Sequence, residues 1–151
     1  PQHIALLAKW ARIREIRDGI NKLIELQRSE GKIGASLQAE ITLFAGTDNV
    51  KWLESFGEDL KYVLITSKVT IKPYTITDGK ILGQFIGTFG PLTTDPVNHP
   101  SIQCHVSPSS RMKCERCWHY CDDVGVNNEH PTICGRCFTN LFGAGEDRKI
   151  A

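Results

Sequence analysis

The chain has 151 residues, of which 40% are hydrophobic and 23% charged, and its formal net charge is +1. These values predict one globular domain or two small ones and exclude a globally disordered chain. No stretch reaches the roughly 18 consecutive apolar residues that span a bilayer, and residues 1–5 lack the pattern of a secretory signal. We therefore expect no membrane partner. The small net charge also excludes a globally basic nucleic-acid binder, although it is compatible with a local basic patch.

The N-terminal residues 3–30 have the pattern of one long amphipathic helix. Their apolar residues recur at helical spacings and define a single stripe. The residues of this stripe are Leu6, Ile13, Ile16, Ile20, Leu23 and Ile24. Gly31 is expected to end the helix because glycine readily adopts the left-handed conformation. The stripe is too apolar to face water, so the helix needs a partner surface.

Beyond the helix, residues 37–45 alternate between apolar and polar positions and predict a half-buried strand. Asp48 is expected to cap a short helix that Gly57 closes, and residues 60–64 favour a further helical turn. Strand spacing returns at residues 69–74, where Pro73 places the strand at a sheet edge.

Residues 75–113 contain so many glycines and prolines that no long element is expected there. Short strands are predicted within residues 81–89 and around Ile102, Cys104 and Val106. Together with the helices, these segments predict an α+β fold.

The cysteines carry the strongest functional signal. The first 103 residues contain none, whereas two Cys-x-x-Cys pairs follow, Cys114 with Cys117 and Cys134 with Cys137. This clustering favours a zinc site in a reducing compartment over a disulfide framework. Four thiolates complete a tetrahedral coordination sphere and leave no position for water, so one structural Zn²⁺ is expected. Gly135 is expected to supply the backbone freedom of a knuckle turn.

Other side chains near the pairs leave alternatives open. Cys121 competes as a ligand, and His119 or His130 are further possible ligands. Cys104, on a predicted strand, is expected to be a small buried apolar residue rather than a nucleophile. No catalytic Ser-His-Asp or Cys-His pairing and no glycine-rich phosphate loop is recognised.

Basic and aromatic residues flank the cysteines. The basic ones either offset the thiolate charge or hold phosphates, and they are Arg111, Lys113, Arg116 and Arg136. The aromatic ones either form a miniature core or, where exposed, stack on unpaired bases. They are Trp118, Tyr120, Phe138 and Phe142.

Several segments resemble one enzyme family. The C-terminus of bacterial isoleucyl-tRNA synthetases is similar to three segments of this chain, residues 113–120, 133–137 and 145–151. The segment that closes their anticodon-binding region is similar to residues 24–28, 31–40 and 64–67. Residues 75–100 match poorly, and Cys121 departs from the family pattern. The ATP-binding signatures His-Ile-Gly-His and Lys-Met-Ser-Lys-Ser do not occur in the chain.

The resemblance implies that the chain is the terminal piece of a longer, monomeric, cytoplasmic enzyme. That parent activates isoleucine with ATP and transfers it to its tRNA, whereas this piece seats the anticodon arm. The implied division is a helical end of the anticodon-binding domain at 1–34, a small α/β junction domain at 35–107 and a zinc finger at 108–151. Without the catalytic and editing domains, the piece alone is expected to be inactive. The residues expected to contact RNA are Arg116, Trp118, His119, Arg136, Arg148 and Lys149.

Two alternative functions remain. The cysteine spacing is also similar to the zinc finger of formamidopyrimidine-DNA glycosylases, whose catalytic N-terminal proline has a counterpart in Pro1. Gln2, however, stands where that family has glutamate. The second alternative is a stand-alone, zinc-stabilised interaction protein with no enzymatic parent.

Overall fold

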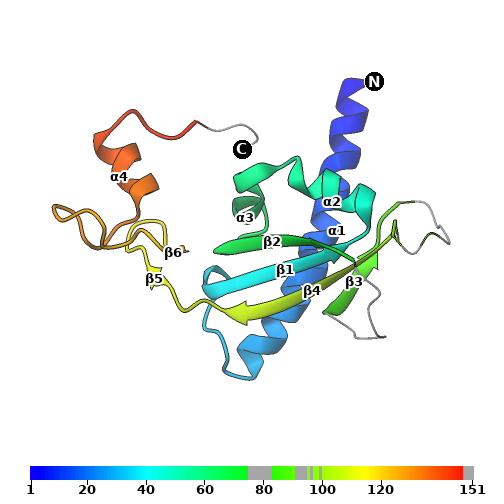
Figure 1. The fold of residues 1–151 in the computed structure, drawn as a ribbon, viewed down its shortest axis with the longest axis horizontal. Helices are drawn as coiled ribbons and strands as arrows, with labels where there is room; N and C mark the ends of the chain where they lie inside the picture. Colours follow the sequence, from blue (N-terminus) through cyan, green and yellow to red (C-terminus); the bar gives the residue numbers. More distant parts are fainter. Residues whose placement is uncertain (75–82, 91–94, 96, 99, 148–151) are drawn as a thin grey trace.

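The computed structural model describes residues 1–74, 83–90, 95, 97, 98 and 100–147. Within these ranges a long helix packs behind a four-stranded sheet, and a small cysteine-rich module extends from the end of the chain's last long strand (Figure 1). This arrangement confirms the α+β class. Of the described helices, none is long and apolar enough to cross a membrane.

Helix α1 spans Gln2–Ser29 and buries one isoleucine face against the sheet. That face consists of Ile13, Ile16, Ile20 and Ile24, each at most 2% exposed. Gly31 follows the C-cap with φ +73°, which confirms the expected stop. Leu6 is 54% exposed, because the first turns of α1 project beyond the sheet (Figure 1). The predicted stripe is therefore buried only in its later part.

The sheet has the strand order β2-β1-β4-β3. Strand β1 (Ala39–Ala45) lies in the centre, parallel to β2 (Lys68–Pro73) and antiparallel to β4 (Ser101–Pro108), which in turn pairs antiparallel with β3 (Gln84–Thr88). Alternate residues of β1 are buried, as its period of two predicts. Among the described strands, β2 pairs with β1 alone, which confirms the edge position expected from Pro73. Residues 81 and 82 of the predicted 81–89 strand lie outside the described residues.

Two short helices connect β1 to β2. Helix α2 spans Thr47–Glu54, and α3 spans Leu60–Val63 after a 3-10 turn at Gly57–Asp59. Gly57 has φ +57° and closes the α2 region as expected. The expectation for Asp48 is wrong: Gly46 occupies the N-cap, and Asp48 lies in the first turn. Its carboxylate instead accepts a hydrogen bond from the Asn98 side chain at 2.7 Å.

Buried side chains of the described residues form two separate clusters. The larger joins α1, the sheet, α2 and α3, and includes Cys104 of β4, which is 1% exposed. Burial raises the pKa of the Cys104 thiol to about 12, so this residue is the buried apolar group that its strand position predicts. The smaller cluster lies in the C-terminal module, which contains β5 (Met112–Lys113), β6 (Tyr120–Cys121) and α4 (Gly135–Phe142).

Candidate metal centre and its basic surround

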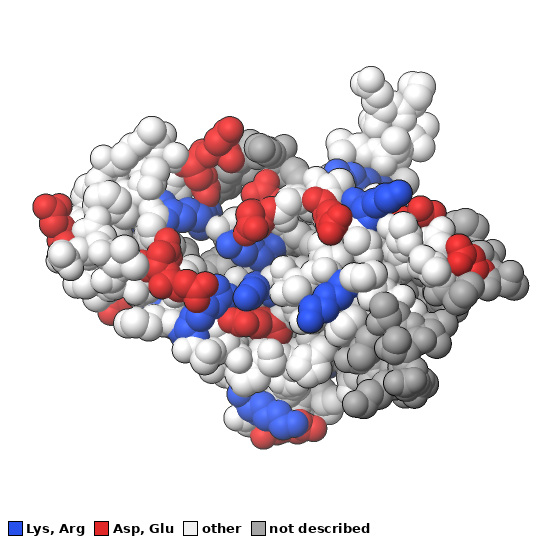
Figure 2. Space-filling view, in the orientation of Figure 1, with Lys and Arg blue, Asp and Glu red and all other residues white. Residues whose placement is uncertain are grey.

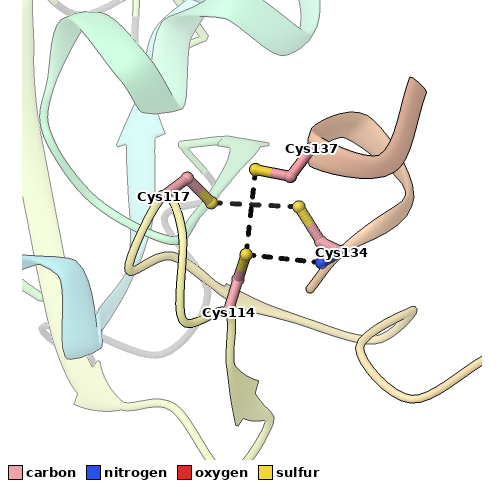
Figure 3. Close-up of side chains that lie close together, drawn as sticks. All are labelled: Cys114, Cys117, Cys134 and Cys137. Atoms are coloured by element: carbon pink, nitrogen blue, oxygen red, sulfur yellow. Dashed lines mark hydrogen bonds between the residues drawn. The ribbon is translucent and has the colours of Figure 1, made fainter. Parts of the chain in front are cut away.

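The C-terminal module brings four cysteine sulfurs together (Figure 3). Cys114 and Cys117 lie in the turn between β5 and β6, whereas Cys134 caps α4 and Cys137 lies in its first turn. The Sγ atoms of Cys114 and Cys137 are 3.8 Å apart, and so are those of Cys117 and Cys134. All four sulfurs lie within 4.8 Å of one another. Segments separated along the chain thus converge on one point.

These distances fit a tetrahedral zinc site. Zinc–thiolate bonds of about 2.3 Å at tetrahedral angles imply sulfur–sulfur distances of about 3.8 Å. Cys114, Cys134 and Cys137 are each at most 2% exposed, and Cys117 is partly buried. The donor set therefore has the chemistry, spacing and burial of a structural zinc site.

The surroundings of the four cysteines lower the pKa of one thiol and raise the pKa of another. Burial disfavours the Cys114 thiolate, but N–H groups of Cys117, Cys134 and Arg116 outweigh it and lower its pKa to about 6. Burial, reinforced by the charge of Cys117, raises the pKa of Cys134 to about 12. A divalent cation would remove this conflict because its charge stabilises every coordinated thiolate.

The turn between β5 and β6, which carries Cys114 and Cys117, contains a residue with an unusual backbone conformation. Trp118 has φ +67°, a left-handed conformation that is uncommon for a non-glycine residue. Its N–H donates to the carbonyl of Cys114 at 2.9 Å, and the N–H of Cys114 donates to the carbonyl of His119 at 2.8 Å. These bonds close the loop that carries Cys117. The side chain of Trp118 stays 60% exposed.

Gly135 was expected to supply backbone freedom for the turn, and this expectation is wrong. Gly135 starts α4 and does not have a positive φ. Its value lies in the missing side chain, since a Cβ there would be 2.6 Å from Oδ2 of Asp123. The Gly135 N–H donates to that oxygen at 2.9 Å. Glycine at this position therefore lets Asp123 approach the start of α4.

The miniature core consists mainly of cysteines. Val124 is buried with the cysteines, and Ile133 and Cys121 pack against them. Phe142 is 58% exposed, and its ring stacks on His130 with 4.3 Å between ring centroids. Of the two alternatives for the aromatic residues, Trp118 and Phe142 are therefore not buried in a miniature core, and Phe142 packs instead with His130 and Phe138. His119 and His130 do not join a group of metal-binding atoms among the described residues.

The residues expected to contact RNA differ in accessibility. Arg116 is exposed, and so is Trp118, above whose ring the Nζ of Lys113 lies at 5.0 Å from the centroid. His119 is partly buried and packs edge-on against Tyr62 at 5.1 Å. Arg148 and Lys149 lie outside the described residues.

Arg136 lies at the junction between the two clusters. Its guanidinium donates two hydrogen bonds to the carboxylate of Glu146, from Nε and, at 2.9 Å, from Nη2, and lies 4.4 Å from the centroid of the Tyr62 ring. The hydrogen bond to Glu146 raises the pKa of Arg136. This arginine is therefore a structural link between the module and α3, on which Tyr62 lies.

Arg111 forms a second link across the same junction. It donates to Glu40 of β1 at 2.8 Å, to Asp122 of the module at 3.4 Å and to the carbonyl of Ser67 at 3.3 Å. Figure 2 shows basic and acidic side chains interspersed over this face of the molecule. Glu40, Tyr62 and Ser67 were missed by sequence reasoning, although Ser67 ends a segment that carries the family resemblance. The visible face is therefore mixed in charge rather than a continuous basic patch.

The module is of a known class. Residues 113–140 match the family described as "Zinc finger found in FPG and IleRS". This match and the four-cysteine cluster together support a structural Zn²⁺.

Almost the whole chain is similar to part of one named enzyme. The chain is similar to proteins named isoleucine–tRNA ligase from several bacteria. It is 44% identical to the one from Cupriavidus necator over 146 residues, 45% identical to that from Cupriavidus taiwanensis over 148 residues, and 44% identical to that from Bordetella petrii over 147 residues. Each alignment covers 97% of this chain and 13% of the relative. The chain is thus homologous to a segment of bacterial isoleucine–tRNA ligases and spans about an eighth of their length. These relatives favour the ligase over the DNA-glycosylase alternative.

Proposed function

We propose that the chain is the tRNA-binding part of an isoleucine–tRNA ligase, held in shape by one structural zinc ion. The similarity along 97% of the chain to proteins of that name carries the proposal. The parent would attach isoleucine to its tRNA using ATP in the cytoplasm. The chain lacks the ATP-binding signatures and would be inactive alone.

The zinc ligands in this proposal are Cys114, Cys117, Cys134 and Cys137. Their sulfurs are the one described group of four that lies within 4.8 Å. Coordination would crosslink the β5–β6 turn to α4, and because such a site does not exist in the unfolded chain, the binding free energy would contribute directly to folding. The ion supplies no chemistry beyond this structural role.

The proposed organisation keeps three units, at 1–34, 35–107 and 108–151. The first two share one buried cluster, since α1 packs on the sheet, whereas the third has a cluster of its own. The cysteine module would therefore act as a distal element, positioned on the rest by Arg111, which bonds to Glu40, and by Arg136, which lies over the Tyr62 ring. We propose that the parent functions as a monomer.

The proposed RNA surface centres on Trp118 and Arg116. An exposed indole offers a stacking face for an unpaired base, worth about 1–3 kcal/mol, and Arg116 adds a charge for phosphate. His119 and Arg136 would act chiefly by positioning, because both pack against Tyr62. Arg148 and Lys149 remain proposed contacts of the tail.

Such a surface would assist catalysis at a distance. Seating the anticodon arm orients the tRNA, so binding free energy obtained far from the reacting atoms is used to place the acceptor end. No residue of this chain needs to touch the reacting groups. Variants of the surface should therefore change tRNA binding before they change isoleucine activation.

Binding of isoleucine tRNA to the zinc-loaded chain tests the proposal. We expect Arg116→Glu and Trp118→Ala each to raise Kd by about tenfold at moderate salt, in line with the loss of one phosphate contact or one stacked base. Arg14→Glu, on the exposed side of α1, is the matched control because it changes the net charge equally. If Arg116→Glu binds as Arg14→Glu does, the proposed surface is wrong.

The ligand assignment needs a separate measurement. Cys114→Ser should lower the zinc content per chain well below one, while Cys104→Ser should retain the ion because Cys104 lies in the other cluster. Elemental analysis of both purified variants gives the answer. A Cys114→Ser chain with one tightly bound zinc would contradict the assignment.

A further inference from the structure

A second group of metal-binding side chains lies beside the four-sulfur cluster and shares one member with it. Ligand atoms of Cys121, Asp123 and Cys134 all lie within 4.8 Å of one another. Cys121 comes from β6, Asp123 from the turn after it and Cys134 from the start of α4. The proposed structural zinc site uses neither Cys121 nor Asp123, so this second group offers two donors that the first ion does not need.

Asp123 is held in place for such a role. Its Oδ2 accepts the N–H of Gly135, the residue directly after Cys134, at 2.9 Å. The neighbouring Asp122 turns elsewhere and pairs with Arg111 at 3.4 Å. One of two adjacent carboxylates is thus fixed beside the shared cysteine, and its second oxygen is not needed for the bond to Gly135.

The group is open to ions from solvent. Cys121, Asp123 and Cys134 line one cavity of about 240 Å³, together with Cys117. Lys61, Arg111 and Arg136 also line this cavity, but each is paired with carboxylates. Lys61 pairs with Glu58 at 3.6 Å, Arg111 with Glu40 and Asp122, and Arg136 with Glu146. Their positive charge is therefore largely compensated, and a cation has a path to the three donors.

The charge balance favours a second cation. Four thiolates around one Zn²⁺ carry a net charge of −2, and the carboxylate of Asp123 adds to it. A thiolate sulfur keeps lone pairs after binding one metal ion, so Cys134 is able to bridge two. Two sulfurs and one carboxylate oxygen form a donor set suited to zinc and to softer ions of the same charge.

We propose that Cys121, Asp123 and Cys134 bind a second thiophilic divalent cation, of the Zn²⁺ or Cd²⁺ class, with Cys134 bridging it to the structural ion. Binding forms bonds from the metal to Cys121 Sγ, an Asp123 oxygen and Cys134 Sγ, and the proton of the Cys121 thiol goes to solvent. Three protein donors leave a position for water. The second ion therefore binds more weakly than the first and exchanges faster.

Native mass spectrometry of the full chain with added Zn²⁺ tests this site. We expect one ion per chain at one equivalent and two ions at a tenfold excess. Cys121→Ser and Asp123→Asn should each keep the first ion and weaken the second by at least about tenfold, since even an outer contact of a metal site contributes that much. Asp123→Asn retains an oxygen that accepts the Gly135 N–H. The substitution therefore removes the negative charge but preserves the fold.

Asp122→Asn is the matched control and should still bind two ions, because Asp122 faces Arg111. A single ion in the wild-type chain at excess zinc would overturn the proposal, and so would two ions in Cys121→Ser or Asp123→Asn. Loss of the first ion in Cys121→Ser would also overturn it, by placing Cys121 in the structural tetrahedron. The proposed tRNA role is independent of all these outcomes, because it requires only the first ion.

Discussion

Tyr120 donates its backbone N–H to the side-chain oxygen of Ser67 across 2.7 Å, and this bond joins the cysteine module to the sheet. Ser67 lies directly before β2 and is 2% exposed. Its hydroxyl in turn donates to the carbonyl of Leu37, and its own carbonyl accepts from Arg111. One small side chain thus holds three segments together.

Ser67→Ala should lower the free energy of unfolding by about 1–3 kcal/mol, because it leaves the partly buried N–H of Tyr120 and the carbonyl of Leu37 without the Ser67 hydroxyl. Urea denaturation of the zinc-loaded chain measures this loss. Ser55→Ala is the control, since the Ser55 hydroxyl makes an exposed bond within its own helix end, and its effect should stay within about 0.5 kcal/mol. Equal effects of the two substitutions would contradict the linking role of Ser67.

Glu40 gives the stability a pH dependence. Burial raises its pKa, but hydrogen bonds from Ser109 and Arg111 and the charge of Arg111 outweigh burial and hold the pKa below its usual value. A depressed carboxyl pKa stabilises the folded state above the unfolded pKa of about 4.3, and this contribution is lost as pH falls through the lower, folded pKa.

Glu40→Gln should therefore cost about 1 kcal/mol at pH 7, and the difference from wild type should shrink as pH falls below about 4. Denaturation curves at several pH values give both numbers. A difference that stays constant down to pH 3 would show that the Glu40 charge contributes nothing.

Gly19 lies where α1 approaches β3 closely. A Cβ at this position would lie 2.9 Å from both the Cβ and the carbonyl oxygen of Ile86 on β3. Alanine in place of glycine stabilises a helix by about 1 kcal/mol. Overpacking, however, costs about 1–3 kcal/mol when the backbone must move. We expect Gly19→Ala to destabilise the chain by about 1 kcal/mol in thermal or urea unfolding. A net gain would mean that α1 shifts freely over β3.

Zinc removal should affect the two clusters differently. Three of the four buried residues in the smaller cluster are cysteines, Cys114, Cys134 and Cys137, whereas α1 and the sheet form the larger cluster without them. After chelation, hydrogen exchange should rise across residues 112–142 and change little in α1 and β1, because metal binding and folding are coupled only in the module. Restored protection on adding zinc is the control, and parallel loss of protection in α1 would contradict two separate clusters.

Local patterns predicted much of this fold. The 3.6-residue period of α1 and the alternation in β1 and β4 depend on short-range spacing, and both appear in the structure. Pro73 correctly placed β2 at an edge, because proline has no N–H to donate to a neighbouring strand. The cap expected at Asp48 was wrong because α2 begins earlier, at Thr47, and the Asp48 carboxylate bonds instead to Asn98, 50 residues along the chain.

The sequence by itself determined that two Cys-x-x-Cys turns would present four soft donors, because each pair depends only on a few adjacent residues. Only the tertiary structure decided which basic residues are occupied in ion pairs or against aromatic rings. Arg111 meets Glu40 and Arg136 meets Tyr62 across the junction between the clusters. Such contacts depend on how distant segments of the chain are arranged in space. Neither the spacing of charges nor the composition of the chain specifies that arrangement.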